Sequence, residues 1–375
     1  MRKHIIYRYF LFLSLVGLMQ LTLSCSSSSN EIEPLKPEGE DTPLEKDEYT
    51  FMNVEYRKWQ NGTFQAWTTA DSRETRTIDN MNWYTPSSDY SRTAWGGRIG
   101  LQPSSVVGKE GFFRVANCGG RSYLLDPDNG AVIIHGIQHV RPGESTAHKK
   151  AFGTRYGSEA RWSEETGKLL ADNHINYISY GSNRIEVFPA AVRGNLLTPK
   201  TQKIAYAENL YLLRTFMWDM SKNLGYAFDD DKYNRLVLLF EPTFATYIDR
   251  LVQEKSALFA GDRHFIGFYL DNELPFASYQ GTGYANTEGG GWLVHTQKNR
   301  GEFYQNFCLR LLETRNCVGW VHFEYNDGYD SNGKASNKGV VSIEYEPYES
   351  FLSQMRQLNL SVHSLIDYYE INSVQ

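Results

Sequence analysis

The sequence predicts an α/β fold, in which parallel β-strands alternate with α-helices and build an open or closed sheet. The first observation is a series of nearly continuous apolar segments of strand length, as expected of strands buried on both faces, at residues 131–137, 175–180, 265–270 and 318–323. The second is that segments with helical periodicity lie between them. In such folds ligands and catalytic groups lie at the carboxyl ends of the strands.

The intervening elements follow in order along the chain. A helix is predicted over residues 158–173, and a third strand over residues 210–217. The next helix begins at Pro242, a residue suited to a first helical turn, and its apolar side chains recur at helical spacing. A further helix spans residues 297–313 and leads into the strand at 318–323.

The amino-terminal residues have the pattern of an export signal. Arg2 and Lys3 precede an apolar run over residues 5–23, and a small residue then precedes Cys25. We expect residues 1–25 to be a lipoprotein signal peptide, with acyl chains on Cys25 that hold the protein at a membrane without spanning it. An uncleaved transmembrane anchor is the alternative. It is disfavoured because Cys25 opens a Ser-rich segment instead of a basic flank.

Three regions follow the signal peptide. Residues 26–48 are Ser, Glu, Pro and Lys with almost nothing apolar, so they cannot bury enough surface to fold and predict a flexible linker. Residues 49–128 contain short β segments separated by turn signals, which predict a small β-rich region. Residues 129–375 would hold the α/β domain.

Composition excludes some functions and leaves others open. The net charge is −6 and the chain has no Lys or Arg cluster, so we expect no nucleic-acid partner. Beyond Cys25 the cysteines are Cys118, Cys308 and Cys317, whose odd number and spacing argue against a disulfide framework or a thiolate metal site. We expect neither a metal nor a cofactor. Aromatic residues make up 14% of the chain, which favours sugar stacking and a large aromatic core equally.

A carboxylate follows one predicted strand directly. The strand FIGFYL at 265–270 is followed by Asp271, Asn272 and Glu273. In α/β glycosidases a glutamate at such a strand end is the general acid/base, which protonates the leaving oxygen, and the preceding Asn binds the sugar. The alternative is a helix-capping cluster, which is common after strands. This segment alone does not decide between the two.

Several stretches, taken together, resemble the β-agarase-like glycoside hydrolases of polysaccharide-degrading bacteria. They occur in the family's order, at residues 111–114, 123–128, 135–137, 265–273, 300–304 and 318–327. The resemblance implies a (β/α)8 TIM-type barrel after a small β domain, and retaining hydrolysis of galactans such as agarose or porphyran. It implies that Glu273 is the acid/base and that Asn272 binds the sugar. With the signal peptide, it also implies a position in the cell envelope, at the outer membrane, facing the periplasm or the exterior.

The sequence departs from the family at the second carboxylate. Retaining hydrolysis needs one about 5 Å from the first, and the family carries it on the seventh strand, in a block for which this chain has no counterpart. The segment between Glu273 and Val318 is too short for three βα units. We therefore expect an incomplete barrel, with strands five to seven missing or shortened. Glu288, in a Gly-rich stretch, is a candidate nucleophile, although a solvated loop residue is the favoured interpretation. Glu324 and Asp327, after the last predicted strand, are the other nearby carboxylates that could substitute.

Further residues are candidates for the lining of a sugar-binding cleft. His139 lies four residues after His135, so the two are expected to share a strand face, and a polar lining is favoured there over a metal site. Trp292 and Trp320 are equally suited to stacking on a sugar ring and to burial in the core. The predicted substrate-binding residues are Asn272, His139, Trp292, Trp320, His322 and Asp327.

Two functions are therefore open. The leading prediction is a lipid-anchored hydrolase that acts on a galactan polysaccharide and contacts the membrane through its anchor only. The alternative is a catalytically inactive, carbohydrate-binding surface lipoprotein, or a decayed hydrolase without its nucleophile. A second carboxylate within about 6 Å of Glu273 would favour the enzyme.

Overall fold

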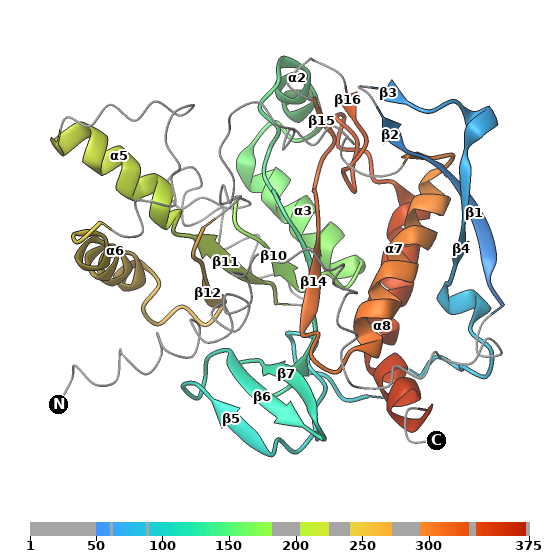
Figure 1. Ribbon diagram of the computed structural model, residues 1–375, viewed down its shortest axis with the longest axis horizontal. Helices are drawn as coiled ribbons and strands as arrows, with labels where there is room; N and C mark the ends of the chain where they lie inside the picture. Colours follow the sequence, from blue (N-terminus) through green and yellow to red (C-terminus); the bar gives the residue numbers. More distant parts are fainter. Residues whose placement is uncertain are drawn as a thin grey trace, which may run out of the picture. The chain divides into compact units, whose positions relative to one another are not determined.

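A parallel sheet is the centre of the fold. The computed structural model describes residues 50–60, 63–87, 90–181, 203–224, 241–271, 293–329 and 335–372. The sheet has the strand order β12-β11-β10-β9-β14 (Figure 1). Its members are β9 (Ile134–Ile137), β10 (Tyr177–Ile178), β11 (Ala205–Asn209), β12 (Phe265–Tyr269) and β14 (Gly319–His322). All neighbouring pairs run parallel, which confirms the predicted α/β class.

The strand order brings the last strand of the sheet beside the first. β14 pairs with β9, with Gly319 opposite Ile134 and His322 opposite Ile137. The other strands follow β9 in chain order, each beside its predecessor. The carboxyl ends of all five strands therefore lie at one edge of the sheet, where the loops after β9 and β14 meet.

The helices begin where the sequence supplies caps. They are α2 (Thr146–Arg155), α3 (Glu159–Asp172), α5 (Leu212–Leu224), α6 (Phe244–Leu258), α7 (Gln297–Glu313) and α8 (Glu349–Asn372). Ser145, Ser158 and Thr296 each accept a hydrogen bond from a backbone N–H of the first turn of α2, α3 and α7. The helices predicted over 158–173 and 297–313 are confirmed as α3 and α7. Within the described residues, the helices all fall short of the length and apolar character that a membrane span requires.

The third strand was predicted at the wrong place. Residues 210–217 contain the start of helix α5, and the strand is β11, just before it. The apolar residues of α5 recur at helical spacing, and Leu213 and Phe216 pack against Phe244 and Tyr247 of the neighbouring helix α6 (Figure 1). The pattern of a short apolar run fits a strand or a helix equally well, and here the packing of the run against α6 favours the helix.

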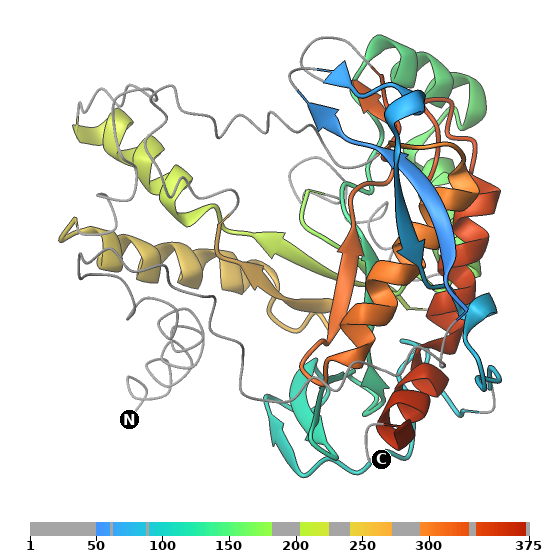
Figure 2. The same ribbon diagram turned by 45° about the vertical axis from the view of Figure 1, so that its right-hand side comes forward.

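The main core lies on the face of the sheet that carries α3 and α8. Ile137, Ile178 and Tyr206 contribute from three strands and are almost wholly buried. They pack in one cluster with Trp162 of α3 and Phe351 of α8. The two longest described helices, α7 and α8, lie side by side (Figure 2).

The remaining strands are antiparallel. They are β1 (Met52–Arg57), β2 (Trp59–Gln60), β3 (Thr63–Phe64), β4 (Asp71–Thr75), β5 (Ser105–Val107), β6 (Arg114–Cys118), β7 (Arg121–Leu125), β8 (Ala131–Val132), β13 (Leu293–Val294), β15 (Gly328–Tyr329) and β16 (Ala335–Ser336). Short 3-10 helices span Trp67–Thr69 and Ile78–Asn80. The predicted strand at 131–137 is divided, because β8 joins the β5–β7 sheet and β9 joins the parallel sheet. β13 pairs with β1 and not with the parallel sheet.

Candidate functional site

The strand ends of β9 and β14 bring a histidine and a carboxylate together. His139, two residues after β9, lies with Nδ1 3.1 Å from Oε2 of Glu324, two residues after β14. Both side chains are partly exposed, at 25% and 17%. The pair therefore combines a carboxylate, held in place by a hydrogen bond, with access from solvent.

The backbone around His139 fixes the ring. His139 has a φ of +56°, a left-handed conformation that ends the alternation of the strand. Gly181, with a φ of +75°, lies against it so closely that an added Cβ would stand 2.7 Å from Cδ2 of His139. His135, by contrast, is buried and its Nδ1 bonds the carbonyl oxygen of His174. The expectation that the two histidines share a face is wrong, because the strand ends at Ile137.

An exposed aromatic ring stands beside this pair. Phe323, directly after β14, is 43% exposed, and its ring centroid lies 5.0 Å from that of His139 in an edge-on arrangement. The ammonium group of Lys338 lies 5.6 Å from the Phe323 ring centroid. A partly exposed ring next to hydrogen-bonding side chains is a typical surface for the apolar face of a sugar. Phe323 is not among the sugar-binding residues predicted from the sequence, although its place at the strand end is the signal that identifies it.

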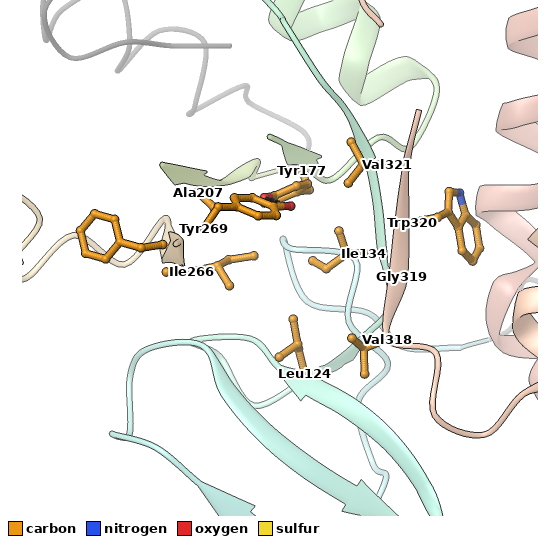
Figure 3. A pocket seen from close by; sticks show the side chains of 12 residues that line it. Leu124, Ile134, Tyr177, Ala207, Ile266, Tyr269, Val318, Gly319, Trp320 and Val321 are labelled. Atoms are coloured by element: carbon orange, nitrogen blue, oxygen red, sulfur yellow. Dashed lines mark hydrogen bonds between the residues drawn. The ribbon is translucent and has the colours of Figure 1, made fainter. Parts of the chain in front are cut away.

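Two predicted sugar-binding residues of β14 face the helices instead. The Trp320 side chain is 6% exposed and donates from Nε1 to the hydroxyl of Tyr304 on α7, at 2.6 Å. Figure 3 shows it directed away from Ile134 and Val321. The imidazole of His322 donates from Nε2 to the Lys338 carbonyl oxygen at 2.9 Å. Trp320 thus takes the core position that the sequence left open, and neither ring is presented to the opposite face of the sheet.

Asp327 holds the loop after β14 in place. It is buried, and its carboxylate accepts from the Gly339 backbone N–H at 2.8 Å and from the Tyr348 hydroxyl at 2.6 Å. Burial raises the pKa of the carboxyl group above its usual value. Of the two carboxylates that follow β14, Glu324 is therefore the one that is open to a ligand, while Asp327 is engaged in the protein.

Hydroxyl groups gather at the ends of β10 and β12. The Tyr177 hydroxyl donates to that of Tyr269 at 3.1 Å, and the Ser179 hydroxyl lies 3.4 Å from it. The rings of Tyr180 and Tyr269 are 4.8 Å apart. Burial raises the pKa of Tyr177, so this hydroxyl remains protonated and keeps its hydrogen bond to Tyr269. At the end of β11, the buried Nδ2 of Asn209 has no hydrogen-bond acceptor among the residues that the structure describes.

An apolar groove lies on the face of the sheet opposite the main core. Its volume is about 280 Å³, and Figure 3 shows Ile134, Ile266, Ala207 and Val321 around it. Tyr177 and Tyr269 stand at the end of the groove that leads to the hydroxyl cluster.

The segment after β12 carries the predicted catalytic residues. Asn272, Glu273, Glu288 and Trp292 lie outside the described residues, as do Cys25 and the linker at 26–48. The last described residue of the segment is Asp271, whose Oδ2 accepts from the backbone N–H of Leu213 at the start of α5. Among the described residues, no group of three or more His, Cys, Asp or Glu side chains is placed to hold a metal ion.

These strand ends, on a parallel sheet whose last strand returns beside its first, define an α/β type of protein with its candidate site at the carboxyl ends of the strands. No protein-family model and no curated protein matches the chain. Among solved structures, BpGH50 matches with a TM-score of 0.69 and 18% identity, over 86% of this chain and 96% of its own. An agarase, AgWH50C, matches with a TM-score of 0.45 and 12% identity, over 75% of this chain and 67% of its own. An exo-β-agarase matches with a TM-score of 0.46 and 11% identity, over 74% of this chain and 68% of its own.

The chain is thus structurally similar, over most of its length, to GH50 agarases, which have a TIM-barrel fold. This confirms, for the fold, the resemblance that the sequence suggested. At such low identity the likeness concerns the fold and not the chemistry.

Proposed function

We propose that the chain is a glycoside hydrolase of the agarase-like group, which cleaves β-linked galactan of the agarose or porphyran type with Glu273 as its general acid/base. The observation that carries the proposal is the position of β12. This strand is part of the parallel sheet and ends at Tyr269, so Asn272 and Glu273 follow at its carboxyl end, where such folds carry their chemistry. The fold of BpGH50, shared over most of both chains, supports it.

The exposed groups at the neighbouring strand ends also support a sugar ligand. Phe323 offers a ring for stacking, and the pair of His139 and Glu324 offers hydrogen-bonding atoms for sugar hydroxyls. The hydroxyls of Tyr177 and Tyr269 extend this polar edge towards β12. Aromatic faces combined with neutral and charged hydrogen-bonding groups suit a polysaccharide better than an apolar ligand.

The proposal includes an incomplete barrel. Between β12 and β14 the described elements are α7 and β13, and β13 pairs with β1 instead of extending the parallel sheet. This supports the absence of strands equivalent to the fifth, sixth and seventh of a closed barrel. The second candidate function follows from it: a carbohydrate-binding protein that lost the strand carrying the nucleophile. Glu288 is the residue we propose to test as a substitute nucleophile.

The deciding experiment measures the release of reducing sugar from agarose, porphyran and plant galactans. Wild-type chain is compared with Glu273→Gln and with Glu344→Gln, a control at an exposed carboxylate that accepts a hydrogen bond from the Ser342 hydroxyl. Release that disappears in Glu273→Gln and persists in Glu344→Gln supports a hydrolase. Absence of release, with retained binding to the same polysaccharide, supports the sugar-binding alternative. For the nucleophile, Glu288→Ala is assayed with added azide, which would yield a glycosyl azide.

We also propose that the protein is lipid-anchored through Cys25 in the cell envelope, at the outer membrane, with residues 26–48 as a tether. The support is the sequence pattern alone: basic residues, an apolar run, and a small residue before Cys25. A tether would let the catalytic unit reach a polysaccharide that is too large to enter the cell.

A further inference from the structure

Trp83 is the most exposed large apolar side chain among the residues that the structure describes. It is 88% exposed. Its φ is +64°, a left-handed backbone conformation that is rare for a bulky residue. An apolar side chain of this size, exposed on a strained backbone, points to an interaction outside the chain rather than to packing.

The two residues beside Trp83 are fixed to helix α8. The carbonyl oxygen of Asn82 accepts from the Tyr368 hydroxyl at 3.3 Å. The Tyr84 hydroxyl is hydrogen-bonded to that of Ser364. The rings of Tyr84 and Tyr368 also pack edge to face, with centroids 5.6 Å apart. The turn is therefore held in place on both sides of Trp83, and the exposed indole belongs to a fixed surface.

Ile371 extends the apolar surface around Trp83. It is 67% exposed and follows Tyr368 by three residues, which places both on one face of α8. Tyr368 is also the residue that bonds the turn of Trp83, so the two exposed side chains lie around the same last turns of the helix. We define the apolar patch by Trp83 and Ile371.

The apolar patch and the candidate site lie at opposite ends of the parallel sheet. Glu370, next to Ile371, forms an ion pair with Arg315 at 3.3 Å, and Arg315 stands between the end of α7 and the start of β14. The last turns of α8 thus lie beside the first residues of β14. His139 and Glu324, by contrast, follow the carboxyl ends of their strands. Figure 1 shows the end of α8 at the bottom, and β15 and β16, which come after β14, at the top.

The proposed tether enters the folded part of the chain beside the apolar patch. Thr50 is the first described residue, and its backbone N–H donates to the Asn80 carbonyl oxygen at 2.9 Å. Its hydroxyl donates to the side chain of Asn82, which precedes the exposed tryptophan, at 3.2 Å. A flexible chain of residues 26–49 would span about 25–30 Å on average. Acyl chains on Cys25 would therefore keep this end of the fold close to the membrane.

The chemistry of the apolar patch suits the lipid–water interface. The indole ring is amphipathic, and tryptophan is enriched at the level of the lipid headgroups. The flat face of a sugar ring is the other ligand that an exposed indole can stack on. The tether favours lipid, because it keeps a membrane, and not a polysaccharide, permanently within reach of the patch.

We propose that the apolar patch of Trp83 and Ile371 contacts the surface of the lipid bilayer, so that the carboxyl ends of the strands face away from the membrane. This inference rests on the proposed lipid anchor, and it holds for a hydrolase and for a sugar-binding protein alike. It goes further than the anchor by giving the protein one orientation, in which the candidate site is open to a polysaccharide outside the membrane.

The test uses the lipidated protein, purified from membranes and reconstituted in phosphatidylcholine vesicles with and without brominated acyl chains. Bromine quenches the fluorescence of tryptophans that it meets, and the difference between wild type and Trp83→Phe isolates the signal of Trp83. Trp218→Phe is the matched control, because Trp218 is 60% exposed on α5, outside the patch. Flotation of the vesicles on a density gradient reports the anchor separately, and melting temperatures identify any variant that fails to fold.

We expect brominated lipid to lower the fluorescence of Trp83 about twofold, because an interfacial indole meets the acyl chains, and to leave that of Trp218 unchanged. Ile371→Ser should reduce this quenching. Protein that floats with the vesicles while Trp83 stays unquenched would overturn the membrane contact and keep the anchor. Protein that does not float would overturn both. Shielding of Trp83 by agarose oligosaccharides, and not by lipid, would assign the patch to a sugar and overturn the membrane contact as well.

Discussion

Acid should destabilise this fold through two buried histidines, His135 and His363. Both are nearly inaccessible to solvent. Burial is the main cause that lowers the pKa of His135 to about 3 and that of His363 to about 4, and the nearby Arg92 guanidinium lowers both further. In the unfolded chain each imidazole titrates near its ordinary value, about 6.5. Below that pH the unfolded state binds more protons than the folded state, so stability falls as the pH falls.

The size of the effect follows from these values. When the pH falls from 7 to 5, protonation stabilises the unfolded state by about 2 kcal/mol per histidine. This figure hardly depends on the pKa in the folded state, as long as that pKa is about 4 or below. The two histidines together should therefore lower the free energy of unfolding by about 4 kcal/mol. Stability should be fully present above about pH 7 and be lost progressively from about pH 6.5 downwards.

Urea unfolding followed by tryptophan fluorescence at pH 7, 6 and 5 measures this loss. His135→Asn is the informative variant, because its amide can still donate to the His174 carbonyl oxygen that His135 bonds at 2.9 Å, and it cannot be protonated. It should be less sensitive to acid than wild type by about 2 kcal/mol between pH 7 and pH 5. Identical pH dependence in both proteins would refute the reasoning, since it would mean that His135 is protonated in the folded state.

Three further predictions concern packing, loop structure and localisation. Phe216→Ala should cost about 3–5 kcal/mol in urea unfolding, because the ring is 1% exposed and packs between Phe244 and Tyr247; a loss below 1 kcal/mol would contradict this packing. Asp327→Ala should lower stability by about 2–3 kcal/mol, since Gly339 N–H loses its acceptor, and Asp327→Asn should lose less. Cys25→Ala should abolish incorporation of radiolabelled fatty acid and release the protein from the membrane fraction; labelling that persists would exclude the proposed anchor.

Much of the architecture follows from local sequence pattern. The segments 265–270 and 318–323 correspond to β12 and β14, because short apolar runs rich in aromatic and β-branched residues favour strands of a parallel sheet. The helix over 297–313 is found with the same bounds, and Thr296 supplies its cap. These elements are encoded by residues that are close together in the chain.

The candidate site is less accessible to such reasoning. His139 and Glu324 are far apart in the sequence, and only the pairing of β14 with β9 brings them to 3.1 Å. Trp320 and Phe323 are both aromatic residues of one strand and its end, yet the first is buried against α7 and the second is exposed. Sequence pattern could not separate them, because which face of β14 carries helices is a property of the whole fold.

The sequence by itself determined the α/β class, helices α3, α6 and α7, and four strands of the parallel sheet, including the strand that leads to Asn272 and Glu273. Local periodicity carries that information, since burial on one or two faces imposes a repeat on the side chains. The tertiary structure alone decided the strand order, the burial of Asp327 and the contact between His139 and Glu324. These depend on contacts between distant segments, for which no local pattern exists.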